Sequence, residues 1–304
     1  MVNFRTILTL LLLLIAQLNS SAQEEKIYQS IRLDSITIIA PNEFDIKRFV
    51  DLTINDTTYL LAFSNLRNVP HKISSKAMVV NRKENEKATR TIIGRQHNAP
   101  GKMWIEKAEE KITGKVYDKK GEHRYYTLEM YDRAFMPADT KKVERLIVTP
   151  KQVNTKQGRM QKHKDQAKLF MFNPGADIES VPLIGDKLSI FDDDMVKYYD
   201  YKISKVMHNN KFCYMFSCIA KPEFASRHTV IKELITWYDV ETMQVLQRSY
   251  HLIANTIGFS FDVKMKVSIA PKNGVFIPNK VEYMGYWNIP LKMRESIVFT
   301  HLTN

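Results

Sequence analysis

Cysteine is scarce in this chain of 304 residues, which contains only Cys213 and Cys218. Both lie in an apolar segment, residues 211–219, that is typical of a β-strand. Residues five apart on a strand are about 16 Å from each other and point to opposite faces, whereas a disulfide requires Cα atoms within roughly 7 Å. The spacing therefore excludes a disulfide between them, and we expect one of the two thiols to react slowly.

Glycine is also sparse, and neither a Gly-x-Ser-x-Gly elbow nor a glycine-rich phosphate loop occurs. The 8 histidines form no HExxH motif and no close pair, and residues 192–194, three aspartates, lack the glycine and glutamate of a calcium loop. Cys213 could pair with His208 or His251, but a cysteine between aromatic residues is more often a small core residue. We expect no metal, no cofactor and no enzyme activity.

Long hydrophobic runs are absent except at residues 7–18, a run too short to cross a bilayer. It follows one cation, Arg5, and precedes Ser20 and Ala22, small residues at the −3 and −1 positions of a signal-peptidase site. The pattern predicts a cleaved signal peptide over residues 1–22. Because no cysteine follows for lipid attachment, we expect a periplasmic or secreted protein without a transmembrane helix.

Acidic residues are too few to balance the basic ones, and the net charge is +12. Such a charge draws a protein toward anionic lipid, acidic glycans or nucleic acid, and export argues against nucleic acid. Residues 151–168 hold six cations and one anion with almost no apolar residue, which predicts a basic loop or linker. The candidate contacts with an anionic membrane surface are Lys156, Arg159, Lys162 and Lys164. The alternative is a solvated basic surface.

The residues that are present favour β-structure. Residues 259–269 alternate strictly, with Ser260, Asp262, Lys264, Lys266 and Ser268 between the apolar positions. Those apolar positions are Phe259, Phe261, Val263, Met265, Val267 and Ile269. Further strands are predicted at residues 36–39, from 77 onward, and at 198–206, 211–219, 234–238, 245–252, 275–283 and 295–302. Residues 113–131 predict a hairpin that turns at 118–121.

In one segment the apolar residues follow the period of a helix and not that of a strand. In residues 56–66, Tyr59, Phe63 and Leu66 recur at i, i+4 and i+7, and Asp56 is placed to cap a helix. A sheet of many antiparallel strands with one apolar side must curl or be covered, and this helix is an available cover.

The order of these elements resembles the outer-membrane lipoprotein carrier superfamily, which includes lipoprotein-sorting relatives. Residues 59–66 match its early helix, and residues 236–248 its recurring hairpin, in which a strand ends in aspartate and returns to a basic residue. The C-terminal half, residues 182–290, is also similar to a soluble segment that precedes the barrel of some outer-membrane proteins. The resemblance implies a concave cavity for acyl chains and an arginine that helps to close it; we match no residue of this sequence to that arginine.

These observations predict a mainly β protein with a few helices, in which a curved antiparallel sheet forms an incomplete half-barrel with helices over its concave face. Residues 23–150 would form the N-terminal part of the β domain, with the early helix. After the loop at 151–168, residues 169–304 would complete the same half-barrel.

The aromatic and aliphatic side chains of the C-terminal half supply the candidate site. The predicted ligand-binding residues on the concave apolar face are Phe259, Phe261, Val263, Met265, Val267, Leu246, Tyr250, Tyr283 and Trp287. A half-barrel has more apolar inner surface than its helices cover, so a cleft for a lipid or an acylated peptide is the first hypothesis. The alternative is an envelope protein–protein interaction or sensor module with a filled cavity and a protein partner.

Overall fold

The computed structural model describes residues 29–33, 36–40, 49, 52–53, 56–81, 85–137, 140–142, 187, 190–191, 193–225, 227–256, 260–288 and 294–304. The signal peptide at 1–22, the basic loop at 151–168 and Phe259 lie outside these residues. The division of the chain at these boundaries therefore stays a prediction.

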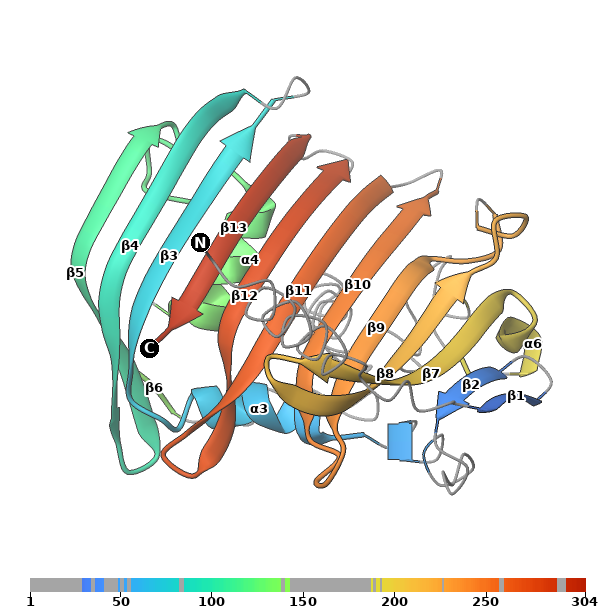
Figure 1. Ribbon diagram of the computed structural model, residues 1–304. Helices are drawn as coiled ribbons and strands as arrows, with labels where there is room; N and C mark the ends of the chain where they lie inside the picture. The colour runs from blue at the N-terminus through green and yellow to red at the C-terminus, as the bar shows by residue number, and fades with distance from the viewer. Residues whose placement is uncertain are drawn as a thin grey trace, which may run out of the picture.

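One large sheet dominates the structure (Figure 1). Its central ten strands are all antiparallel, and the sheet is not closed, as the half-barrel prediction required. In spatial order they are β7 (Tyr199–His208), β8 (Lys211–Ala220), β9 (Ile231–Asp239), β10 (Val245–Asn255), β11 (Ser260–Lys272), β12 (Val275–Asn288), β13 (Glu295–Thr303), β3 (His71–Val80), β4 (Glu86–Ala99) and β5 (Lys102–Gly114).

Short strands extend both edges of this sheet. The pair β1 (Gln29–Leu33) and β2 (Ile36–Ala40) lies beside β7, and β6 (Lys141–Lys142) pairs with the first residues of β5. The pairing of β2 with β7 is parallel, which departs from a purely antiparallel sheet. Parallel neighbours need a long crossover, and here the whole segment from β3 to β6 separates the two strands in the chain.

Helix α3 (Thr58–Leu66) confirms the helix predicted for residues 56–66. Its buried side chains are Tyr59, Ala62, Phe63 and Leu66. The backbone N–H and hydroxyl of Thr58 both donate to Asp56 Oδ1, at 2.9 and 2.7 Å, so the aspartate satisfies a free amide of the first turn.

The hairpin predicted for residues 113–131 is wrong in its second half, which forms α4 (Tyr126–Phe135). The buried residues Thr127, Leu128, Tyr131, Ala134 and Phe135 follow the 3.6-residue period of a helix. The β-favouring residues Tyr125, Tyr126 and Thr127 masked this period in the sequence. A third helix, α6 (Asp193–Val196), is a single turn.

The two longer helices pack on the same face of the sheet, which we call the concave face. Both belong to one hydrophobic core with the sheet, and the rings of Phe63 in α3 and Phe135 in α4 are 6.3 Å apart. In β11 the predicted alternation is confirmed: the side chains of Phe261, Val263 and Met265 are buried while the intervening ones are exposed. We call the opposite side of the sheet the outer face.

Candidate functional site

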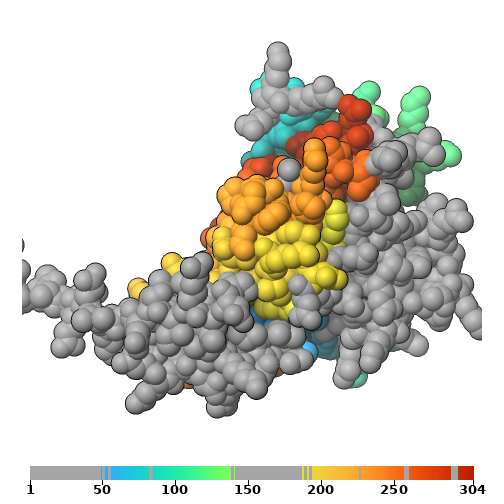
Figure 2. All heavy atoms as spheres, turned by 90° about the vertical axis from the view of Figure 1, so that its right-hand side faces the viewer, coloured from blue at the N-terminus to red at the C-terminus, as the bar shows by residue number. Residues whose placement is uncertain are grey.

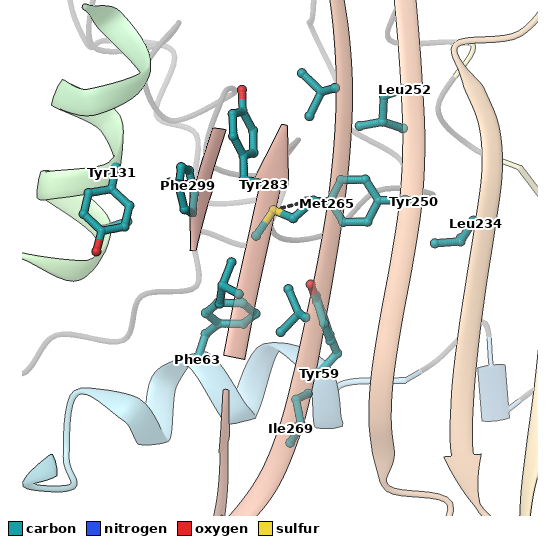
Figure 3. Packing of buried hydrophobic residues seen from close by; sticks show 14 of the residues in the cluster. Tyr59, Phe63, Tyr131, Leu234, Tyr250, Leu252, Met265, Ile269, Tyr283 and Phe299 are labelled. Atoms are coloured by element: carbon teal, nitrogen blue, oxygen red, sulfur yellow. Dashed lines mark hydrogen bonds between the residues drawn. The ribbon is translucent and has the colours of Figure 1, made fainter. Parts of the chain in front are cut away.

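Aromatic side chains from both helices and from the central strands meet on the concave face (Figure 3). Tyr59 and Phe63 of α3 pack edge to face at 5.3 Å. Tyr131 of α4 lies 4.8 Å from Phe299, which stacks on Tyr283 at 4.7 Å and 9°. The helices therefore cover this face with flat, stiff side chains, a surface suited to apolar groups.

The structure places most of the predicted ligand-binding residues on this face. Six of them are at most 3% exposed: Phe261, Val263, Met265, Val267, Tyr250 and Tyr283. Trp287 is half-buried, packs against Phe261 at 4.9 Å and donates its Nε1–H to the Tyr283 hydroxyl at 2.7 Å. These side chains are already covered in the described structure, so a ligand can reach them only if part of the cover moves.

Leu246 differs from the other predicted residues because it lies in a register shift between Val245 and Gln247. The bulge moves its side chain out of the alternation, and Leu246 is half-buried while Val245 is fully buried in the core.

A buried ion pair joins the start of α3 to the sheet. Arg248 on β10 contacts Asp56 at 3.2 Å, and the two side chains are 8% and 4% exposed. The guanidinium also donates to Thr236 Oγ1 at 3.1 Å and lies 4.3 Å from the centre of the Tyr59 ring. Removing one of two buried, paired charges is costly, so this pair holds α3 in one position.

A second ion pair, whose arginine is buried and whose aspartate is half-buried, fastens α4. Arg90 on β4, 1% exposed, contacts both carboxylate oxygens of Asp132, and Arg90 also donates to the Tyr117 hydroxyl at 2.8 Å. His123 adds a contact to Asp132 at 2.8 Å. Burial by itself would raise the pKa of the Asp132 carboxyl, but its hydrogen bonds to His123 and Arg90 lower that pKa below its ordinary value.

The N-terminus of α4 also depends on the sheet. Glu295, the first residue of β13, is 4% exposed and accepts the backbone N–H groups of Tyr126 and Thr127 at 2.7 and 2.8 Å. A carboxylate at this end of a helix satisfies free amides and opposes the helix dipole favourably. α4 is thus held at its N-terminus and at Asp132.

Further along α4, the Tyr131 hydroxyl donates to Ser75 at 2.6 Å and contacts His301 Nδ1 at 2.7 Å. Because that hydroxyl proton points to Ser75, Nδ1 carries the hydrogen of a neutral His301 ring. Burial, together with a smaller effect of the nearby His71, lowers the pKa of His301 to about 3. The polar groups under α4 therefore favour an uncharged histidine.

Sequence reasoning missed both ion pairs, although one signal was available. Alternate residues of a strand face the same side, so Arg248 lies on the same face of β10 as Tyr250 and Leu252. It is a charged residue on an otherwise apolar face. Asp56 was identified only as a helix cap. The pairing of Arg90 with Asp132 could not be read in the same way, because α4 itself was not recognised.

The outer face carries a different hollow, of about 600 Å³, across β9 to β13. Residues of both charge signs line it, including Glu233, His251, Lys264, Lys266 and Glu282. Within the described residues no three His, Cys, Asp or Glu side chains are placed to hold a metal ion. No helix in the described part of the chain is long and apolar enough to cross a membrane.

The two cysteines are free thiols on β8, and both are fully buried. Burial raises the pKa of both thiols, and that of Cys218 rises well above its ordinary value. Since the thiolate is the reactive form, slow reaction is now expected at both sites and not at one alone.

No family model matches this chain, and no curated protein matches it either. The solved structures that match this chain include three proteins. A Vibrio parahaemolyticus domain described as an outer membrane lipoprotein-sorting protein shares 8% identity over 81% of this chain and 89% of its own, with a TM-score of 0.25. A DUF1329 family protein from Desulfovibrio piger shares 11% identity over 80% and 88%, with a TM-score of 0.24. A LolA superfamily protein from Nitrosomonas europaea shares 9% identity over 80% and 90%, with a TM-score of 0.23.

These neighbours are lipoprotein-sorting, LolA-superfamily and DUF1329 proteins, and they include the superfamily that the sequence resembles. Identities and TM-scores of this size carry no information on ligand or function.

Proposed function

We propose that this chain is a non-enzymatic protein of the bacterial envelope, periplasmic or secreted, that binds a lipid or an acylated peptide on the concave face of its sheet. The observation that supports this proposal is an apolar face, rich in aromatic residues, whose helical covers α3 and α4 are each fastened by one arginine–aspartate pair with a buried arginine. Such pairs fix position more than they add stability, because desolvation offsets most of their attraction.

The free energy gained by burying the side chains of α3 is similar in size to that gained by burying an acyl chain. The three large side chains that α3 buries, Tyr59, Phe63 and Leu66, contribute about 1.5–3 kcal/mol each, or about 5–9 kcal/mol together. An acyl chain of about fifteen CH₂ groups contributes about 0.8 kcal/mol per group, or on the order of 12 kcal/mol. The two contributions are similar in size, so we propose that an acyl chain displaces α3; separating Arg248 from Asp56 adds to the cost of that exchange.

A test of this function is uptake of a fluorescent fatty acid, with native mass spectrometry of protein purified from its own envelope. Wild-type protein should bind the probe. Val263→Trp places a larger side chain in the packed concave face and should abolish uptake, whereas Lys264→Trp, at the adjacent exposed position, should leave it unchanged. Denaturation curves show whether each variant is folded. If wild-type protein takes up no probe and carries no lipid, ligand binding is rejected.

A specific observation favours a second function, an envelope protein–protein interaction or sensor module. The lining residues Tyr250, Met265 and Tyr283 are at most 3% exposed in the described structure, as in a filled cavity. A module of this kind would bind its partner through an outer surface and would take up no acyl chain.

The basic loop at 151–168 remains a proposal of its own, since it lies outside the described residues. We propose that Lys156, Arg159, Lys162 and Lys164 contact anionic lipid, where each cation contributes up to about 1 kcal/mol at modest salt.

A further inference from the structure

Two large apolar side chains are exposed at the end of the β7–β8 hairpin. Met207 is 57% exposed and Phe212 is 52% exposed, and the two are direct partners across the ladder. By strand alternation they lie on the same face as Ile203 and Phe216, which are buried on the concave face at 0% and 2% exposure. The apolar stripe of the core thus continues to the hairpin tip and emerges there into solvent.

The geometry of the tip is well defined by its turn. Asn209 and Asn210 have φ values of 48° and 62°, the left-handed pair of a two-residue hairpin turn that matches the twist of the strands. On the outer face of the same tip, His208 stacks on Trp237 with centroids 5.4 Å apart. The apolar pair and the stacked rings thus lie on opposite faces at one end of the sheet, and yellow atoms of the β7–β8 region reach the molecular surface in Figure 2.

Cations accompany these side chains. Lys205 Nζ lies 5.1 Å from the centre of the Phe212 ring, and Lys211 is the first residue of β8, directly after the turn. Asp239, the carboxylate on the neighbouring hairpin, accepts the N–H groups of Glu241 and Thr242 at 3.0 and 2.9 Å in its own turn. Lysines beside exposed aromatic and apolar groups are typical of an interface with anionic lipid headgroups.

We infer that this tip, defined as Lys205, Met207, Lys211, Phe212 and Trp237, docks on an anionic bilayer surface, with Met207 and Phe212 entering the headgroup layer. The lysines beside the exposed apolar pair favour an anionic bilayer over a protein partner, because such a surface attracts cations and accepts apolar side chains. This docking is independent of the proposed ligand site.

Flotation with phosphatidylglycerol-containing vesicles tests the docking. The double variant M207S/F212S should lower partition about tenfold or more at physiological salt. The matched control I93S/M284S removes two equally exposed apolar side chains elsewhere on the sheet, 47% and 54% exposed, and should change partition less than twofold. The variant K205Q/K211Q should weaken partition several-fold and flatten its salt dependence, while the basic loop stays intact in all three.

If the tip variant and the control variant lose equal amounts of vesicle partition, the inference is overturned, since exposed apolar area in general would then explain binding. So would wild-type protein that does not float with these vesicles, the result expected if a protein partner occupies the tip. Urea midpoints within a small range of wild type establish that the exposed substitutions leave the fold intact.

Discussion

Arg248 and Asp56 are charged residues inside an otherwise apolar contact between a helix and a sheet. Their value to the protein lies in position, because hydrophobic residues would stabilise the same contact as well or better. Arg248 also covers the ring of Tyr59, so one side chain fixes both the N-terminus of α3 and the orientation of its first large residue.

A double-mutant cycle tests this pairing. Arg248→Met leaves the Asp56 carboxylate buried without a cation and should lower the free energy of unfolding by about 3–5 kcal/mol. Adding Asp56→Asn should recover most of that loss, because the asparagine oxygen can still accept the Thr58 N–H that caps α3. Urea denaturation measures both. A single variant that loses less than about 1 kcal/mol would mean that the pair is solvated.

At the scale of one element, β11 shows how a strand divides two environments. Val263, 1% exposed, faces Leu252 and Gly285 on the neighbouring strands, while Lys264 beside it is exposed on the outer face. The strand thus separates the packed concave face from the hollow on the outer face, which Lys264 and Lys266 help to line.

Val263→Asp and Lys264→Asp place the same carboxylate on the two faces of β11. The first should destabilise the protein by several kcal/mol, since a buried carboxylate there has no cation partner; the second should stay within about half a kcal/mol. Thermal or urea unfolding midpoints that are lowered by the same amount in both variants would contradict the assignment of the faces.

Element by element, the sequence predicted what depends on local periodicity. The strict alternation of β11 and the i, i+4, i+7 spacing in α3 each follow from residues that are neighbours in the chain. What it could not predict depends on partners that are distant in sequence. α4 begins where Glu295 accepts its first amides, 169 residues from Tyr126, and Leu246 leaves the core through a bulge set by pairing with β9. Local preferences for strand were overruled in α4 by tertiary contacts.

At the scale of the whole molecule, the buried histidine on β13 couples stability to pH. The pKa of His301 is lowered to about 3 by burial, whereas an unfolded histidine titrates near 6.5. Between these values the unfolded chain binds a proton that the folded protein does not, so stability falls as pH falls from about 6.5 toward 3. The slope approaches about 1.4 kcal/mol per pH unit for this group.

Melting temperature measured across that range tests the coupling. His301→Gln should flatten the decline, because glutamine keeps an amide near Tyr131 but has no proton to gain. His97→Gln, at a more exposed histidine, is the control and should decline as wild type does. A decline that is unchanged in His301→Gln would assign the acid sensitivity to other groups, of which His71, whose pKa burial also lowers, is the first to test.

The position of β13 in the sheet has a consequence for the order of folding. This last strand lies between β12 and β3, where Phe299 pairs with Tyr283 on one side and Ala77 on the other (Figure 1). Until β13 is in place, β3 and β12 both present unpaired edges, and β3 to β6 cannot join the rest of the sheet. Contacts between residues so far apart in sequence make folding slow, because the entropy of loop closure is lost before strand pairing stabilises the chain. The complete sheet therefore forms only once residues 295–303 have paired on both sides, and its two parts stay separate until then.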